Sequence, residues 1–276
     1  MEDFELLPFI RISGVGATSG AAFLNDHLYL ISANSNCLYC CNIETGKVEN
    51  IAICGPGEDI MAKNIEPNFE SISIYNDSLF LFGSGASDKK RAAIQIFLDP
   101  LDISGFDLSA IFSQAKETFS IPDSIFNIEG AFFYDGYLYF FQRGNETKRL
   151  NGFFRVDLET FAENHEVEFF PVILPKINGI TATLTDALVF SDSLFFLATA
   201  QDSNSINDYG KIGGTMIGIL NNKTFEVDQF MIISNEHKFE SFTVYKEYDR
   251  FIEFLVSQDN GTEEEETHIY KLILGF

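Results

Sequence analysis

Basic residues are scarce in this sequence. Its 276 residues include 18 Lys and Arg against 41 Asp and Glu, which gives a formal net charge of −23. Proteins that bind nucleic acids need Lys and Arg facing the phosphates, and anionic membrane surfaces also attract basic segments. We therefore expect neither a nucleic acid nor a membrane as a partner.

Long hydrophobic runs are also lacking. No window approaches the roughly 20 apolar residues that a membrane span requires. The N-terminal sequence MEDFELLPFI has no basic region and no long apolar stretch, so we do not expect it to act as a signal peptide. The sequence therefore predicts a cytoplasmic location. Its content of 46% hydrophobic and 21% charged residues is typical of a folded globular chain.

Cysteine and histidine are too few and too poorly spaced for the common metal and catalytic sites. The four cysteines include one C-x-x-C, but no second pair of Cys or His ligands completes a zinc site. We interpret Cys37, Cys40, Cys41 and Cys54 as small apolar residues of strands. The four histidines show no spacing typical of a catalytic triad, and no G-x-S-x-G motif occurs.

One pattern is repeated five times along the chain. An apolar-rich strand, a short polar turn and a second apolar strand recur, and a polar residue marks the head of each first strand. These marked residues are Ser19, Glu70, Glu129, Thr185 and Glu240. Successive marks are 51, 59, 56 and 55 positions apart. The 36 residues after the last mark and the 18 before the first together equal one more repeat.

Repeats of this length with several short strands predict an all-β, five-bladed β-propeller with four-stranded blades. We expect one domain over residues 1–276. The last repeat ends one strand short, so the segment Phe4–Ile10 would supply its outer strand and close the ring. Residues 106–119 predict a short helix with Asp107 as its N-cap. An all-β sandwich or barrel is the alternative fold, but it would not explain five equal repeats.

The marked residues predict a metal site. The first strand of each propeller blade lines the central channel, so these residues would ring one mouth of it. Carboxylates about 6 Å apart repel by roughly 3 kcal/mol per pair at an effective dielectric of about 20. Either protonation or a bound cation must relieve that repulsion. Oxygen ligands suit Ca²⁺ better than Mg²⁺, so we predict Ca²⁺ held by Ser19, Glu70, Glu129, Thr185 and Glu240.

Two alternatives accompany this metal site. The channel would instead hold water, with its acids solvated or bonded to backbone N–H groups. Asp186 would replace Thr185 if the strand register slipped by one residue, because such a slip decides which side chain faces the channel.

The loops between second and third strands would lie at the same mouth, and two of them are rich in basic residues. They contain six of the 18 basic residues: Lys89, Lys90, Arg91, Arg143, Lys148 and Arg149. Arginine suits phosphate and carboxylate groups. We therefore predict a small anionic ligand beside the ion, bound by Lys89, Arg91, Arg143, Asn145 and Asp202. Solvated charges paired with the acidic surface are the alternative.

Several runs of residues resemble known proteins. The segments NIEGAFFYDGYLYFFQRGN and TDALVF, with PNFES before them, resemble an uncharacterised bacterial five-bladed β-propeller family of unknown function over about residues 11–245. More distantly, the order Ser, Glu, Glu, Thr, Glu at the heads of the five inner strands resembles the calcium-dependent nucleotidases called apyrases. This resemblance implies a calcium ion bound by the same five residues and makes Arg143 a candidate nucleotide contact.

The sequence thus favours a binding propeller with a divalent cation in its channel and a small anionic ligand on the same face. One alternative is a metal-dependent phosphohydrolase, in which the ion polarises a phosphoryl oxygen and Arg91 or Arg143 stabilises the developing charge. Another is a protein-interaction scaffold whose acidic surface recruits a basic partner. Whether the protein is an enzyme, and how many copies assemble, stays open at this point.

Overall fold

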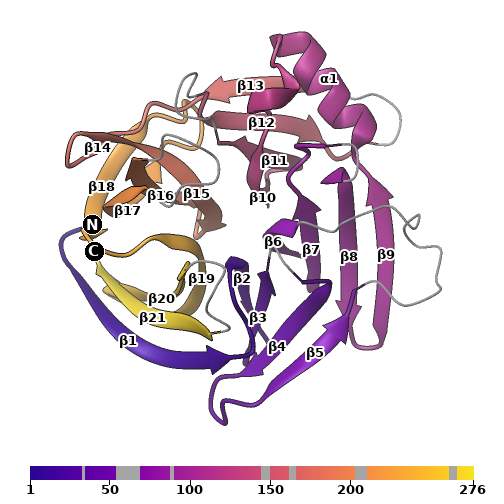
Figure 1. Cartoon of the computed structure of the whole chain (residues 1–276). Coiled ribbons are helices and arrows are strands. Elements are labelled where there is room, and N and C mark those ends of the chain that lie inside the picture. Colours follow the sequence, from indigo (N-terminus) through magenta and orange to yellow (C-terminus); the bar gives the residue numbers. More distant parts are fainter. Residues whose placement is uncertain are drawn as a thin grey trace.

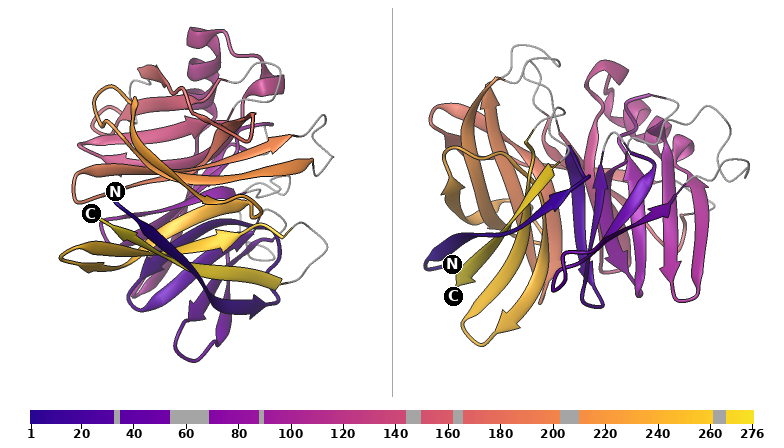
Figure 2. Two further views of the ribbon diagram at one scale, coloured as in Figure 1. Left: turned by 90° about the vertical axis from the view of Figure 1, so that its left-hand side faces the viewer. Right: turned by 60° about the horizontal axis from the view of Figure 1, so that its bottom comes forward.

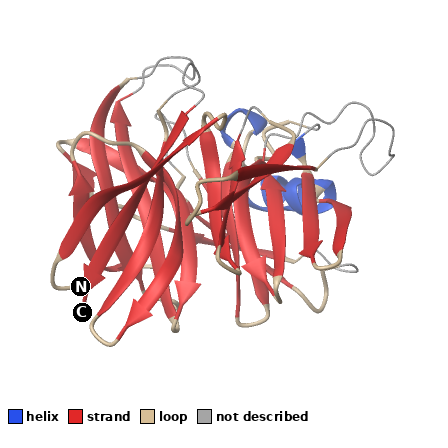
Figure 3. Ribbon diagram, turned by 90° about the horizontal axis from the view of Figure 1, so that it is seen from below, coloured by secondary structure: helices blue, strands red, loops and turns tan. Residues whose placement is uncertain are grey.

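The computed structural model consists of five antiparallel β-sheets arranged as blades around a central channel (Figure 1). It describes residues 1–32, 35–53, 69–87, 90–143, 150–161, 166–202, 210–260 and 266–276. The views from the side show the blades packed face to face, with the hairpin turns at one end of the ring (Figures 2 and 3). The predicted five-bladed propeller is therefore confirmed.

Each blade contributes four strands in the same order from the channel outward. The inner strands are β2 (Thr18–Leu24), β6 (Phe69–Tyr75), β10 (Ile128–Tyr134), β15 (Ile180–Phe190) and β19 (Phe239–Tyr248). The second strands are β3 (His27–Ser32), β7 (Ser78–Gly83), β11 (Tyr137–Gln142), β16 (Ser193–Asp202) and β20 (Phe251–Gln258). The third strands are β4 (Cys37–Asn42), β8 (Ala92–Leu98), β12 (Gly152–Asp157), β17 (Lys211–Leu220) and β21 (Glu266–Gly275). The outer strands are β5 (Val48–Ala52), β9 (Leu101–Asp107), β13 (Val167–Pro171), β18 (Val227–Ser234) and β1 (Phe4–Ser13).

Tight turns join the inner and second strands and fix their pairing register. In the second blade, Asn76 and Asp77 adopt φ values of 48° and 58° between the paired residues Tyr75 and Ser78. Two consecutive left-handed residues are typical of the type I′ turn, whose twist matches that of a β-hairpin. Asn and Asp tolerate this conformation better than most residues. This is why a short polar turn between two apolar strands correctly predicted a hairpin here.

The N-terminal strand closes the ring. Strand β1 pairs antiparallel with β21, from Phe4 opposite Leu274 to Ser13 opposite Glu266. The first strand of the chain is therefore the outer strand of the fifth blade, as predicted. This pairing covers a sheet edge that would otherwise expose unpaired backbone groups.

The structure differs from the prediction in two details. The fourth blade has a fifth strand, β14 (Lys176–Ile177), which pairs with β15 across a turn at Asn178 and Gly179, both with positive φ. Helix α1 (Ser109–Phe119) is confirmed, but its N-cap is Leu108. Asp107, one residue before the observed N-cap, accepts a hydrogen bond from the Ser109 N–H through its carboxylate at 2.8 Å.

Aromatic side chains fill the interfaces between blades. The largest fully buried side chains are all phenylalanine, and burial of each contributes on the order of 2 kcal/mol. Helix α1 seals the interface of the second and third blades, where Phe112 packs on Phe126 and Phe140. A short 3₁₀ helix, η2 (Asp123–Ile125), follows it. Among the described residues, no helix has the length and apolar character to cross a membrane.

Candidate functional site

A β-bulge interrupts each inner strand at the residue that the repeats marked. The pairing of inner and second strands shifts register at Ser19, Glu70, Glu129, Thr185 and Glu240. A bulge leaves its extra residue out of the hydrogen-bonded ladder and redirects the side chain. Five equivalent bulges therefore set the five marked residues around one end of the channel, the bulge-side mouth.

Two carboxylates of the bulge-side mouth pair with one guanidinium, and a third interacts with it electrostatically. We call Glu70, Glu129 and Glu240 the acid cluster. Arg143 follows strand β11, and its Nη1 lies 3.0 Å from Glu129 Oε2 and 4.0 Å from Glu240 Oε2. The side chains of Arg143, Glu129 and Glu240 are only 20%, 14% and 11% exposed, so water screens these charges weakly. The Arg143 guanidinium thus pairs with two of the carboxylates that the sequence predicts as ligands of Ca²⁺.

A second cation completes this network. The Lys238 ammonium donates to Glu240 Oε1 and, at 2.8 Å, to Asp259 Oδ2. Lys238 and Asp259 were not predicted from the sequence. The sequence did contain a signal for Lys238: Asn127 and Lys238 both stand two residues before an acid of the cluster, so they occupy equivalent positions in two repeats. In the third blade, the Asn127 amide donates to Glu129 Oε1 in the same way.

The backbone places Arg143 and Asp259 at equivalent points of two blades. Each residue directly follows its second strand, and its N–H donates to the residue two before the bulge. The Arg143 N–H bonds to Asn127 O at 2.9 Å, and the Asp259 N–H bonds to Lys238 O at 3.0 Å. The same backbone position therefore carries a cation, Arg143, in the third blade and an anion, Asp259, in the fifth.

Burial and mutual repulsion disfavour full ionisation of the acid cluster. Burial raises the pKa of Glu70 well above its ordinary value, and Glu129 and Glu240 raise it further, while Lys90 and Arg143 oppose them. Burial also raises the pKa of Glu240, although Lys238 and Arg143 partly offset this. Burial alone would lower the pKa of Arg143, but Glu129 and Glu240 raise it above its usual range. Additional positive charge at this mouth would therefore be favourable.

The two hydroxyl residues of the ring bond to neighbouring blades. Ser19 Oγ donates to Phe69 O at 2.7 Å, and Thr185 Oγ1 donates to Phe239 O at 3.1 Å. Each bond ties a bulge to the inner strand of the next blade. Thr185 is buried at its bulge, and Asp186 lines the channel cavity farther along the strand.

The residues predicted to bind an anion are only partly brought together. Of these, Arg143 lies beside the acid cluster, where it pairs with Glu129 and Glu240. Arg91 directly precedes β8, and the pKa of Asp123 is lowered mainly by Lys116 and more weakly by Arg91. Asp202 is exposed at the end of β16, and no hydrogen bond or ion pair between described residues joins it to the cluster. The predicted residues Lys89 and Asn145 lie outside the described residues.

The described residues contain no group of three or more His, Cys, Asp or Glu side chains placed to hold a metal ion in this arrangement. The predicted Ca²⁺ site stays a prediction that requires Arg143 to move from the acids. Cys37, Cys40 and Cys41 are free thiols on β4, and Cys54 lies outside the described residues.

Comparison with known proteins supports the fold. The model of a family of unknown function (DUF6929) matches residues 14–274. No curated protein matches the sequence. Among solved structures, glutaminyl cyclase from Myxococcus xanthus is similar with a TM-score of 0.56 and 10% identity, covering 98% of this chain and 97% of that chain. The allergen Mala s 1 of Malassezia sympodialis gives a TM-score of 0.53 and 12% identity, covering 99% of this chain and 96% of that chain. Identities this low indicate a common fold alone.

Proposed function

This chain belongs to DUF6929, a family of unknown function, and we propose that it is a ligand-binding propeller whose site is the bulge-side mouth. The observation that supports this role is that Glu129 and Glu240, from two different blades, both pair with one guanidinium, while Glu70 from a third blade interacts electrostatically with all three groups. Five packed blades hold these groups in place, and a rigid scaffold that positions charged groups at a mouth is a common arrangement for binding sites.

The first ligand that we propose is a divalent cation, with Ca²⁺ preferred over Mg²⁺. The acid cluster offers carboxylate oxygens from three directions. Burial, followed by repulsion from neighbouring acids, raises the pKa values of Glu70 and Glu240, and a bound cation would stabilise their ionised forms. Binding of the ion requires Arg143 to leave Glu129 and Glu240, since both cations need the same oxygens. Ser19 and Thr185 have lone pairs that would complete the ligand set.

The second ligand that we propose is a small anion on the same face. Once an ion displaces the Arg143 guanidinium from Glu129 and Glu240, the guanidinium is available for a phosphate or carboxylate group. Arg91, Lys89, Asn145 and Asp202 are the further contacts that the sequence predicts for this anion. Anion binding should consequently depend on the cation.

The test is calorimetric titration of chelator-treated protein with CaCl₂, followed by inorganic phosphate. Wild-type protein should bind Ca²⁺, and Ca²⁺ at about 100 times the dissociation constant should raise the free energy of unfolding by roughly 2.7 kcal/mol. Glu70→Gln should weaken Ca²⁺ binding at least tenfold. Glu117→Gln, an exposed helix position, is the matched control. Phosphate should bind only with Ca²⁺ present, and Arg143→Gln should abolish this. Absence of heat and of stabilisation with both Ca²⁺ and Mg²⁺ would refute the cation site.

The two alternative functions are separated from binding by their own readouts. Ca²⁺-dependent phosphate release from a nucleoside diphosphate would identify a phosphohydrolase. Retention of a basic protein by the wild type, lost when the acid cluster is replaced by Gln, would identify a scaffold.

A further inference from the structure

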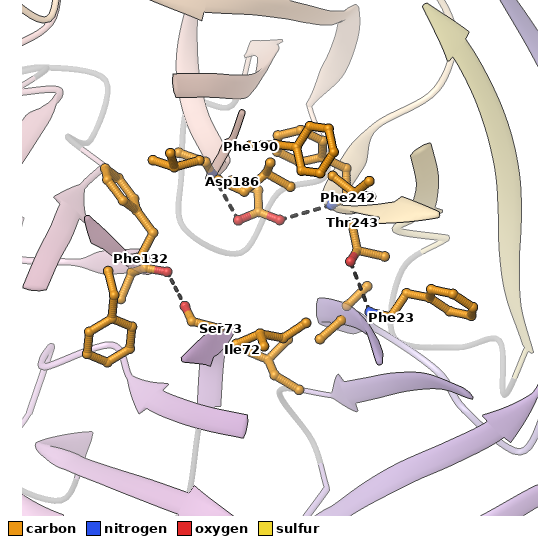
Figure 4. A pocket seen from close by; sticks show the side chains of 17 residues that line it. Phe23, Ile72, Ser73, Phe132, Asp186, Phe190, Phe242 and Thr243 are labelled. Carbon is orange, nitrogen blue, oxygen red and sulfur yellow. Dashed lines mark hydrogen bonds between the residues drawn. The ribbon is translucent and has the colours of Figure 1, made fainter. Parts of the chain in front are cut away.

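A second candidate site lies inside the channel, farther along the inner strands than the bulges. All five inner strands line a cavity of about 210 Å³ there. Figure 4 shows the residues around it. An apolar cavity of about 150 Å³ is large enough for benzene, so this cavity has room for such a ring with a short polar substituent.

Among the described residues that line the cavity, Asp186 is the only ionisable one. Its Oδ1 accepts the Ala187 N–H at 2.8 Å and its Oδ2 accepts the Phe242 N–H at 2.9 Å. A carboxylate has about four acceptor positions, so each oxygen retains one. No ion pair between described residues neutralises this carboxylate.

Two hydroxyl groups provide the remaining polar side-chain atoms of the cavity wall. Ser73 Oγ donates to Ala131 O and retains its lone pairs. Thr243 Oγ1 accepts the Phe23 N–H at 2.9 Å and retains its own O–H donor. Figure 4 shows Asp186, Ser73 and Thr243 around the cavity, on three different strands. Apolar walls with a few convergent polar groups are typical of small-molecule sites.

We propose that the channel cavity binds a compact organic cation, a primary ammonium on an apolar body, with the ammonium on Asp186. The ammonium group has three donors, and the two free acceptor positions of Asp186 match two of them. Its charge neutralises a carboxylate that the protein otherwise keeps buried without a cation. The argument for this ligand does not rest on the ligands proposed for the bulge-side mouth.

The test compares benzylammonium with benzyl alcohol, a neutral probe of nearly the same shape. Calorimetric titration of wild-type protein should show at least tenfold tighter binding of benzylammonium. Asp186→Asn keeps the shape of the side chain but removes its charge, and should abolish that preference. Equal affinity of the wild type for both probes, or an unchanged preference in Asp186→Asn, would overturn the proposal.

A measurement on wild-type protein locates the probe even if Asp186→Asn does not fold. Nuclear Overhauser contacts should join the benzyl protons to the methyl groups of Ile72 and Thr243, which line the cavity. Contacts to residues of the bulge-side mouth instead would place the ammonium on the acid cluster and would overturn the channel site.

Discussion

Arg143 Nη1 lies 4.0 Å from Glu240 Oε2, although these residues belong to the third and fifth blades, which are not neighbours in the ring. The Arg143 side chain therefore extends from the third blade across the bulge-side mouth toward the fifth. Its guanidinium also pairs at 3.0 Å with Glu129 of its own blade. A single side chain thus couples the charges of two separate blades.

Replacement of Arg143 by Met should lower the free energy of unfolding by about 3 kcal/mol, because removal of one partner from a shielded ion pair leaves the others uncompensated. Urea denaturation at pH 7 measures this. Adding Glu129→Gln to the variant should restore part of the loss. Lys47→Met is the control, since its pair with Glu49 is exposed and should contribute nothing measurable. Equal losses in Arg143→Met and Lys47→Met would contradict the prediction.

The stability of the protein should depend on pH through Glu70. Its pKa in the folded state is raised, mainly by burial. As the pH rises above the ordinary Glu pKa of about 4.3, the unfolded chain loses this proton first. Unfolding therefore becomes easier between that pH and the raised pKa. Glu70→Gln cannot titrate, so wild type should lose stability relative to this variant from pH 4.5 to pH 7.5.

Thermal melts of both proteins in chelator at these two pH values measure the difference. Glu117→Gln should follow wild type. A wild type that gains stability over Glu70→Gln as the pH rises would show that Glu70 is preferentially ionised in the folded state.

Gly130 should tolerate no side chain. A Cβ atom there would lie 1.7 Å from Phe141 Cζ, and Phe141 is fully buried. We expect Gly130→Ala to lower the free energy of unfolding by about 1–3 kcal/mol through overpacking. Combining it with Phe141→Leu should cost less than the sum of the single changes, as a double-mutant cycle by urea denaturation would reveal. Simple additivity would mean that the backbone moves instead of the ring.

Thr243 should stabilise the junction of the first and fifth blades. Its Oγ1 accepts the Phe23 N–H, a backbone donor on the channel edge of β2. Thr243→Val keeps the shape but leaves that donor unpaired, so we expect a loss of about 1–2 kcal/mol in urea denaturation. Thr118→Val, at an exposed position of α1, is the matched control and should change stability by less than about 0.5 kcal/mol. A similar effect of both changes would mean that water replaces the lost acceptor.

The sequence allowed the fold and the equivalence of the five marked residues to be predicted because both follow from repeats, which are visible along the chain; the bulges at these residues were not predicted. The partners of the acid cluster were harder to predict. Arg143 was identified as a loop cation, but its reach to Glu240 depends on the diameter of the ring. Lys238 and Asp259 have no counterpart of the same charge in the third blade, so repeat comparison did not reveal them. Strand β14 was missed because its signal is only the short turn at Asn178 and Gly179.

The strand pairing that closes the ring also brings the two chain ends together. The Glu2 N–H donates to Gly275 O at 2.9 Å, and the Phe276 N–H donates to Arg250 O beside the turn at the far end of β19 from its bulge. In Figures 2 and 3 the ends lie side by side, away from the bulge-side mouth. A short linker should therefore permit circular permutation, and attachment to a sensor surface through either end should leave the acid cluster facing the solution.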